Sequence, residues 1–203
     1  LQNHSRIIYN PYMIYLIFYG ILVFFVFLFA LLLFIYSLFS VVAQLMGSPY
    51  VPTKQKEVEY ILKKAGLKKG QLLIELGSGD GRVIRTAVSR YKVRGIGIEI
   101  HPLLLIWSHI FTRLQKLNDK PSTSKTVIFR RENFFNTDVS KADVIFLFLM
   151  PHTLKKLREK FVKECKKNTL IISHGFKIEG WEGFLQYTIP HTPFPTYFYR
   201  ILP

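Results

Sequence analysis

The chain has 203 residues, which allow one folded domain and an additional segment but exclude two complete enzymes. It carries 28 Lys and Arg residues against 13 Asp and Glu residues, a net charge of +15, and yet 49% of its residues are hydrophobic. Because the mean hydropathy is still positive, at +0.20, one strongly apolar segment must be joined to a strongly basic one.

The first element is an almost wholly apolar segment, residues 12–46, and no charged side chain occurs between Ile7 and Thr53. A membrane-spanning helix needs about 20 apolar residues, whereas the apolar part of a signal sequence has about 7–15. Core helices are seldom apolar on every side. The segment therefore predicts a transmembrane helix. Its surplus length leaves open a tilt, a Tyr-rich interfacial extension or a re-entrant turn near Gly20.

The charges on either side of this segment predict its orientation. Arg6 and His4 precede it, and six lysines follow it closely: Lys54, Lys56, Lys63, Lys64, Lys68 and Lys69. Because positive residues stay on the cytoplasmic side, we expect a single-pass protein whose soluble part faces the cytoplasm or an equivalent interior compartment. That part holds all the acidic residues and all but one of the basic ones. Such a charge suits anionic lipid, acidic protein or nucleic acid, and the apolar segment favours lipid.

A linker, Gly47–Pro52, ends the apolar helix because it contains two prolines and a glycine. We expect Thr53 to cap a short helix that ends at Gly66 and has apolar residues at helical spacing: Val58, Ile61, Leu62 and Ala65.

The remaining sequence alternates between strand and helix patterns. Strands are expected at Leu72–Leu76, Gly95–Ile100, Thr126–Phe129, Asp143–Leu149 and Leu170–Ser173, followed by a terminal pair at Phe184–Ile189 and Tyr197–Leu202. Helices are expected at Val83–Tyr91, Pro102–Leu117 and Thr153–Lys167, with a polar loop at Asn118–Lys125. This alternation predicts an α/β domain in which helices cover both faces of a mainly parallel sheet.

A glycine-rich turn follows the first expected strand. Gly77, Gly79 and Gly81 permit a sharp turn and close approach of a ligand, because no Cβ stands in the way. Their spacing differs from the G-x-G-x-x-G of dinucleotide-binding sites. The carboxylates of Glu75 and Asp80 flank the turn, which disfavours a diphosphate and favours a ligand that carries an ammonium and a sulfonium group.

A further acid ends the second expected strand. Glu99 lies 20 positions after Gly79, about where an acidic residue binds a ribose hydroxyl in related folds. A ribose, an adenine and a cationic amino-acid tail together describe S-adenosylmethionine. In the alternative interpretation, Glu75 and Glu99 are strand-end charges paired with Arg82 or Arg94, and the glycines only shape a turn. The order of strand, turn, helix, strand and acid favours the cofactor.

These residues resemble motifs I and II of the class I, seven-strand methyltransferases. Four further segments resemble the archaeal broad-specificity protein-lysine methyltransferases and the mitochondrial lysine methyltransferases of the ATP synthase c subunit and adenine nucleotide translocase: Tyr50–Thr53, Glu75–Arg82, Asn133–Phe135, and Ser173–His174 with Gly180–Trp181. The resemblance implies a Rossmann-like seven-strand sheet with helices on both faces. We thus expect a tail and membrane helix over residues 1–46, a pre-catalytic linker and helix over 47–70, and a methyltransferase domain over 71–203.

The resemblance also implies roles for individual residues. Glu75 and the backbone of the turn would line the methionine moiety of S-adenosylmethionine: Gly77, Ser78, Gly79, Asp80 and Gly81. Glu99 would bind the ribose, Asn133 would lie beside the adenine, and Tyr50 and Thr53 would close over the cofactor. Leu149–His152 replaces the Asn-Pro-Pro-Tyr type of sequence that grips planar amino groups, which argues against methylation of bases or glutamine.

Methyl transfer from a sulfonium is an in-line displacement that requires a neutral amine held near the methyl group. Since the reference pKa of lysine is about 10.4, the amine must first lose a proton. His152 and His174 are candidates to line the lysine channel or pass that proton to water, and Trp181 is a candidate wall. In the alternative, the histidines are strand-end groups bonded to backbone and the tryptophan is core. We expect no metal site, because Cys165 is the single cysteine and the histidines lack ligand spacing.

The sequence therefore predicts a membrane-anchored protein-lysine methyltransferase whose substrate presents a lysine near the membrane and whose residues 12–46 contact the bilayer. Two alternatives stay open: a methyltransferase for a lipid or small hydrophobic molecule, and a cofactor-binding membrane module without catalysis. A nucleic-acid enzyme is disfavoured, although the positive charge permits phosphate binding.

Overall fold

The described part of the N-terminal unit lies within one long helix. The computed structural model describes residues 11–46, 51–118, 127–190 and 193–202, and the chain divides into units at residues 1–39 and 40–203. Helix α1 (Pro11–Met46) has 36 residues and continues through Gly20, so it contains no re-entrant turn there. Its residues 12–41 are long and apolar enough to cross a membrane. At about 1.5 Å per residue, the helix exceeds the roughly 30 Å of a bilayer core.

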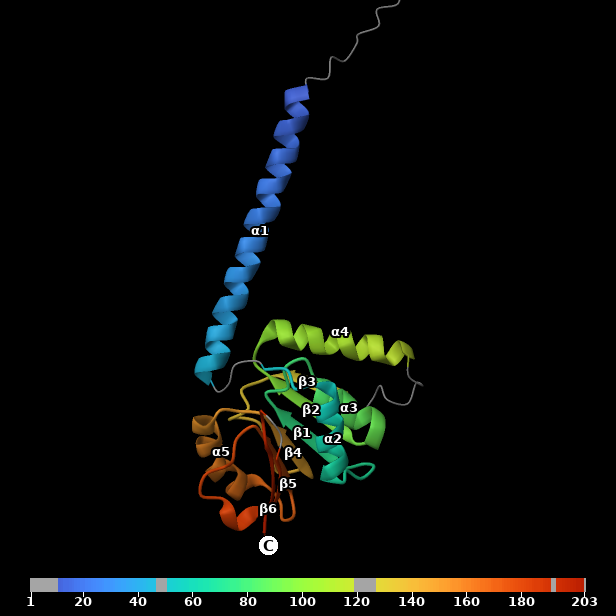
Figure 1. The fold of residues 1–203 in the computed structure, drawn as a ribbon, viewed down its shortest axis with the longest axis vertical. Helices are drawn as coiled ribbons and strands as arrows, with labels where there is room; N and C mark the ends of the chain where they lie inside the picture. The colour runs from blue at the N-terminus through green and yellow to red at the C-terminus, as the bar shows by residue number, and fades with distance from the viewer. Residues whose placement is uncertain (1–10, 47–50, 119–126, 191–192, 203) are drawn as a thin grey trace, which may run out of the picture. The chain divides into compact units, whose positions relative to one another are not determined.

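The second unit is built on a seven-stranded sheet with the order β3-β2-β1-β4-β5-β7-β6 (Figure 1). The strands are β1 (Leu72–Leu76), β2 (Arg94–Glu99), β3 (Val127–Arg131), β4 (Val144–Leu147), β5 (Leu170–His174), β6 (Leu185–Ile189) and β7 (Thr196–Arg200). The first five strands are mutually parallel, and β7 is antiparallel to both β5 and β6. This arrangement confirms the expected Rossmann-like methyltransferase sheet.

Helices cover both faces of the sheet, as predicted. On one face, α2 (Gln55–Ala65) and α3 (Arg82–Tyr91) bury their apolar residues with Leu73 of β1. On the other face, α5 (Pro151–Glu164) packs against a core that includes Ile74 of the same strand. Since side chains alternate along a strand, β1 contributes to both cores and is buried over its whole length. Helix α4 (Pro102–Asn118) contacts β2 and β3.

Several element boundaries differ from the expected ones for local reasons. Lys54, not Thr53, is the N-cap of α2, and its carbonyl accepts the first amide bonds of the helix. The backbone carbonyl of Thr53 is instead bonded to Arg82. Helix α5 begins two residues earlier than expected, because Pro151 occupies its first turn, where the missing N–H costs nothing. Residues 119–126, which hold most of the expected polar loop, lie outside the described residues.

Candidate active site

The candidate site lies where the strand order of the sheet reverses. Strand β1 pairs with β2 on one side and with β4 on the other, and successive connections run in opposite directions from this point. Ligands of open α/β sheets bind at the carboxyl ends of the strands beside such a reversal. The glycine turn leaves β1 at this edge, and a Cβ added to Gly77 would lie 3.3 Å from Leu149, which follows β4. The segments after β1 and β4 therefore meet here.

The glycine turn depends on backbone angles that favour glycine. Gly77, Gly79 and Gly81 have φ values of +79°, +54° and +76°. The amides of Gly77 and Ser78 both donate to the carbonyl of Ile98 at 2.9 Å, which fastens the turn to β2. A Cβ on Gly81 would overlap the ring of Phe129. The sequence pattern is thus explained by both the sharp turn and the close packing behind it.

Glu99 supports the same turn from the end of β2. Its side chain is buried, and its Oε2 accepts a hydrogen bond from the Gly79 amide at 2.8 Å. Its Oε1 accepts one from the His101 amide, also at 2.8 Å. Each carboxylate oxygen keeps a second lone pair, which suits it to accept a hydrogen bond from a ribose hydroxyl. Arg94, the ion-pair partner in the alternative interpretation, donates instead to the carbonyl of Gly70.

Glu75 is the most perturbed carboxyl group of the site. Burial raises its pKa well above 4.5, and the nearby charges of Asp80 and Glu99 raise it further, while the Ile84 amide bonds the carboxyl group. Among the described residues, no hydrogen-bond partner reaches its Oε2 atom. The charge of Arg85 acts in the opposite direction, but the pKa of Glu75 is still raised. A buried carboxylate that its surroundings compensate only in part is costly, so this position favours a cationic ligand.

Arg82 joins Asp80 to the segment that precedes the sheet. Its Nη2 lies 2.7 Å from Asp80 Oδ2 and its Nε 3.0 Å from Oδ1, while its Nη1 donates to the Thr53 carbonyl at 2.7 Å. Burial would raise the pKa of Asp80, but the hydrogen bonds and charge of Arg82 outweigh it and hold that pKa below 3.8. Thr53 is therefore held near the glycine turn. Sequence reasoning missed this link, for which the Asp-x-Arg spacing was the only signal.

Asn133 lies at the same edge of the sheet as Glu99. It follows β3 by two residues, and Glu99 is the register partner of Arg131 in that strand. Its Oδ1 accepts a hydrogen bond from the Phe135 amide at 3.0 Å, which forms a local turn. Its role beside the adenine stays a prediction.

The two candidate histidines occupy different environments. His174, the last residue of β5, is fully buried, and its Nδ1 is hydrogen-bonded to Thr196 Oγ1 at 2.9 Å. Its Nε2 lies 4.0 Å from Glu57, and its ring meets Phe148 edge-on at 4.6 Å. His152 is exposed in the first turn of α5. His174 is thus enclosed, whereas His152 is open to solvent.

Trp181 belongs to the core and not to the site edge. Its side chain is 2% exposed, and its ring centroid lies 4.9 Å from Phe184, 5.9 Å from Tyr199 and 6.0 Å from Phe161. This aromatic cluster packs against α5. The position gives no support to the expected wall of a lysine channel. Tyr50 lies outside the described residues, and the described part of the chain contains no cluster of three or more potential metal ligands.

The comparisons with known proteins agree with this geometry. The family model of the ANTKMT methyltransferase domain matches residues 75–184, more than half of the chain. This chain belongs to that family. A protein-lysine N-methyltransferase of Saccharolobus islandicus (strain REY15A) is 35% identical over 134 residues, 66% of this chain and 80% of the relative. The human lysine N-methyltransferase of the ATP synthase c subunit is 24% identical over 133 residues, 66% of this chain but only 54% of that protein.

A solved structure gives the cofactor. The RNA methyltransferase from Salinibacter ruber, in complex with S-adenosyl-L-homocysteine, is 30% identical, with a TM-score of 0.68 over 75% of this chain and 94% of the other. S-adenosylmethionine is therefore the cofactor of the present chain, as predicted. The described residues fit it, because the buried Glu75 oxygen suits a cation, Glu99 suits a ribose, and the glycines of the turn carry no Cβ that would keep a ligand from the backbone.

Proposed function

We propose that this chain is a membrane-anchored protein-lysine N-methyltransferase that acts on lysines close to a membrane surface. The observation that carries the lysine specificity is the 35% identity to an archaeal protein-lysine N-methyltransferase over 80% of its length. The human relative, named for its action on the ATP synthase c subunit, supports a protein substrate as well. The apolar helix α1 supports the anchor.

The chain's own residues supply binding and orientation. S-adenosylmethionine, when bound, supplies a methyl group on a positively charged sulfur. Glu75 and Glu99 supply buried carboxyl groups beside the glycine turn, and Arg82 holds the Thr53 segment near that turn. The acceptor lysine must arrive as a neutral amine, and exposed His152 is the candidate to pass its proton to water. Geometry would be the main catalytic contribution, because the leaving group of a sulfonium is a neutral thioether, which no residue has to protonate.

The proposed anchor is the reason for proposing lysines near the membrane as the substrate. Residues 12–41 carry no charge, and a helix of that length inserted in a bilayer would hold the catalytic unit beside embedded proteins. Such tethering raises the local concentration of membrane-proximal lysines without any additional contact. The lysines that follow the helix in sequence support a catalytic unit on the cytoplasmic or equivalent interior side.

The proposal is tested by incubating the detergent-solubilised chain with methyl-labelled S-adenosylmethionine and a membrane-protein extract. We expect label on lysine, located by mass spectrometry. The label should vanish in a Glu75→Ala, Glu99→Ala double variant and persist in Glu159→Ala, which removes an exposed carboxylate of α5. Deletion of residues 1–46 should lower the methylation of membrane proteins in cells, and unchanged methylation would overturn the anchor.

A parallel reaction with total RNA examines a second candidate function. The 30% identity to an RNA methyltransferase and the net charge of +15 are the observations that favour it. Label in RNA, or in the lipid fraction, with none on lysine would replace the protein substrate by that molecule. Cofactor binding without label in any fraction would identify a non-catalytic binding module.

A further inference from the structure

Helix α4 buries polar residues and exposes apolar ones, the opposite of an ordinary amphipathic helix in a soluble domain. Its polar residues Ser108 and Thr112 are buried, at 0% and 9% exposure. Five large apolar residues form an exposed apolar stripe on one side of the helix, with exposed fractions from 37% to 53%: Ile106, Trp107, Ile110, Phe111 and Leu114. Their spacing of three and four residues is that of a single helical face. In a water-soluble domain this face would normally be the buried one.

The buried side of α4 has a local explanation. A Cβ added to Gly81 would lie 3.1 Å from the Cβ of Ser108, so the helix passes close to the glycine turn and needs a small residue there. The hydroxyls of Ser108 and Thr112 donate to carbonyls of the same helix at 2.7 Å. The inner side is thus satisfied by the packing of the domain. The packing does not explain why the outer side is apolar.

The composition of the stripe is typical of a membrane interface. Trp107 and Phe111 stack with ring centroids 5.6 Å apart, and tryptophan favours the boundary between headgroups and acyl chains. A patch of this kind on a soluble surface marks a binding site. Arg113 is exposed on the same helix, and the guanidinium of Arg85 lies 5.3 Å from the centroid of the Phe111 ring. The stripe is therefore bordered by positive charge.

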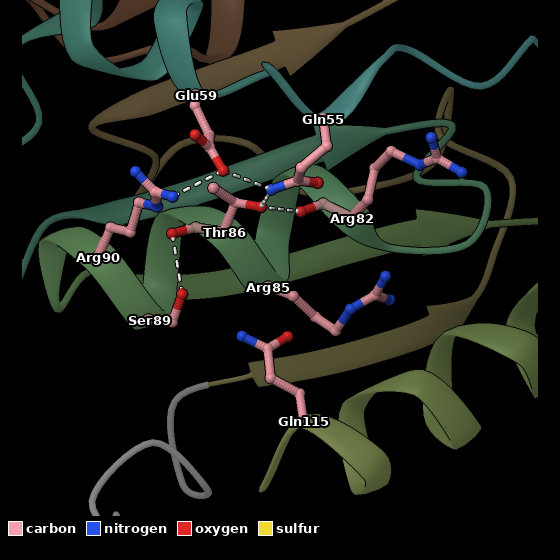
Figure 2. A pocket seen from close by; sticks show the side chains of 8 residues that line it. All are labelled: Gln55, Glu59, Arg82, Arg85, Thr86, Ser89, Arg90 and Gln115. Atoms are coloured by element: carbon pink, nitrogen blue, oxygen red, sulfur yellow. Dashed lines mark hydrogen bonds and ion pairs between the residues drawn. The ribbon is translucent and has the colours of Figure 1, made fainter. Parts of the chain in front are cut away.

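A hollow of about 480 Å³ adjoins the stripe. Helix α3 supplies the arginines of this arginine hollow, α2 supplies Gln55 and Glu59, and α4 supplies Gln115 (Figure 2). Its lining residues include three positive side chains, Arg82, Arg85 and Arg90. Arg82 pairs with Asp80 at 2.7 Å, Arg90 pairs with Glu59 at 2.6 Å, and Arg85 donates to the carbonyl of Asp80. Three positive charges against two negative ones leave the hollow positive. Arginine binds phosphate oxygens through several N–H groups at once. Arg85 belongs to both features, because it lines the hollow and lies over Phe111.

We propose that the apolar stripe and the arginine hollow form one docking surface for an anionic bilayer. The stripe enters the boundary between headgroups and acyl chains, and the hollow receives the phosphate of an anionic lipid. The two features match the two chemical parts of a phospholipid. A second copy of the chain fits this surface poorly, since two strongly basic units would meet through arginine-bordered faces. The inference rests on the proposed membrane anchoring.

Docking through α4 would act on the site through β2. Helix α4 begins at Pro102, only three residues after Glu99, so a fixed α4 holds the cofactor-binding end of that strand at the membrane. The anchor alone limits the distance of the catalytic unit from the bilayer, whereas this surface also sets which side faces it.

The experiment uses the two tryptophans of the full chain as reporters. The protein is reconstituted into vesicles that contain phosphatidylglycerol and lipids brominated near the headgroup, which quench nearby indoles. Trp107 is half exposed on the stripe, whereas Trp181 is 2% exposed in the core. We expect quenching in the wild type and its loss in Trp107→Phe, which leaves Trp181 as the only emitter. Phosphatidylcholine vesicles and Arg90→Gln should each weaken the quenching.

Flotation of the same vesicles separates failure of the docking surface from failure of the anchor. A chain that does not float with the vesicles lacks the anchor. If the wild type and Trp107→Phe both float and are quenched equally, the anchor is supported and the docking surface is overturned. Self-association is examined in detergent with acrylamide, a quencher that stays in water. If acrylamide quenches Trp107 less as the protein concentration rises, the stripe is covered by a second copy of the chain, and the proposal is overturned. Unchanged circular dichroism shows that each variant is folded.

Discussion

The carboxylate of Glu99 accepts a hydrogen bond from the amide of Gly79 at 2.8 Å, across 20 positions of sequence. One acidic residue therefore supports the shape of the glycine turn and also offers lone pairs to a ligand. Turn and acid act as a unit, because a change in the acid also changes the backbone that it holds.

Glu99→Gln should weaken the binding of S-adenosylmethionine by about tenfold or more. The carboxylate accepts amides on both oxygens, and a glutamine NH₂ would face one of these donors. Loss of a hydrogen bond to a charged group costs about 1.5–3 kcal/mol. Isothermal titration calorimetry measures the affinity, with Glu179→Gln at an exposed position as the control. Equal affinities in the two variants would show that Glu99 contributes nothing.

Gly81→Ala should destabilise the fold much more than Gly66→Ala. Both glycines have positive φ values, +76° and +63°, which cost an L-residue about 1–2 kcal/mol. A Cβ on Gly81 also overlaps the Phe129 ring, whereas no described atom lies within 4 Å of one on Gly66. Overpacking adds about 1–3 kcal/mol. Urea denaturation measures the free energy of unfolding, and equal losses would mean that Phe129 moves away freely.

Glu75→Gln should stabilise the cofactor-free protein at neutral pH while weakening its binding of S-adenosylmethionine. Burial and the neighbouring carboxylates raise the pKa of Glu75 above 4.5 in the folded state, so the folded chain binds this proton more tightly than the unfolded chain. Stability must then decline as the pH rises from 4.5 through the folded pKa. Glutamine removes that decline.

Thermal unfolding of wild type, Glu75→Gln and Glu159→Gln across this pH range checks the effect on stability. Glu159→Gln changes an exposed residue and should follow the wild type. Cofactor affinity should change in the opposite direction, rising with pH in the wild type as the carboxylate ionises, and remaining flatter in Glu75→Gln. A wild-type stability that rises with pH over the same interval would contradict the assignment.

Arg82→Lys should raise the KM for S-adenosylmethionine and expose the Thr53 segment to proteases. A single ammonium group cannot reproduce the fork that binds both oxygens of Asp80 and the Thr53 carbonyl. At about 1.5–3 kcal/mol for such bonds, the rise should be about tenfold. Steady-state kinetics and limited proteolysis measure the two effects. Arg200→Lys, at a surface arginine bonded to the Asn168 carbonyl, is the matched control and should change neither.

The fold and the centre of the site could be predicted because their signals are local. A buried strand, three alternating glycines and an acid at the next strand end occur within about 30 residues, and each residue type is required by backbone geometry or burial. The boundaries were less predictable, because they depend on distant partners. Thr53 has the composition of a helix cap, but its carbonyl is bonded to Arg82, 29 positions later.

Two other residues show why side-chain environments are harder to predict. Trp181 follows a glycine in a segment that resembles a family motif, but its environment is set by Phe161 and Tyr199, from distant elements. In α4 the helix itself was predicted correctly. Which side of α4 is buried could not be predicted, because periodicity identifies an apolar side without showing whether protein, water or lipid covers it.

The acidic surroundings of Glu75 also bear on turnover. Transfer of the methyl group leaves an uncharged thioether where a sulfonium had been, so the spent cofactor has lost one of the positive charges that this region favours. If Glu75 lines the methionine moiety as expected, the site should release its product more readily than its reactant. The rate of methylation in a cell would then follow the supply of fresh cofactor and tolerate accumulated S-adenosylhomocysteine better than a neutral pocket of the same shape.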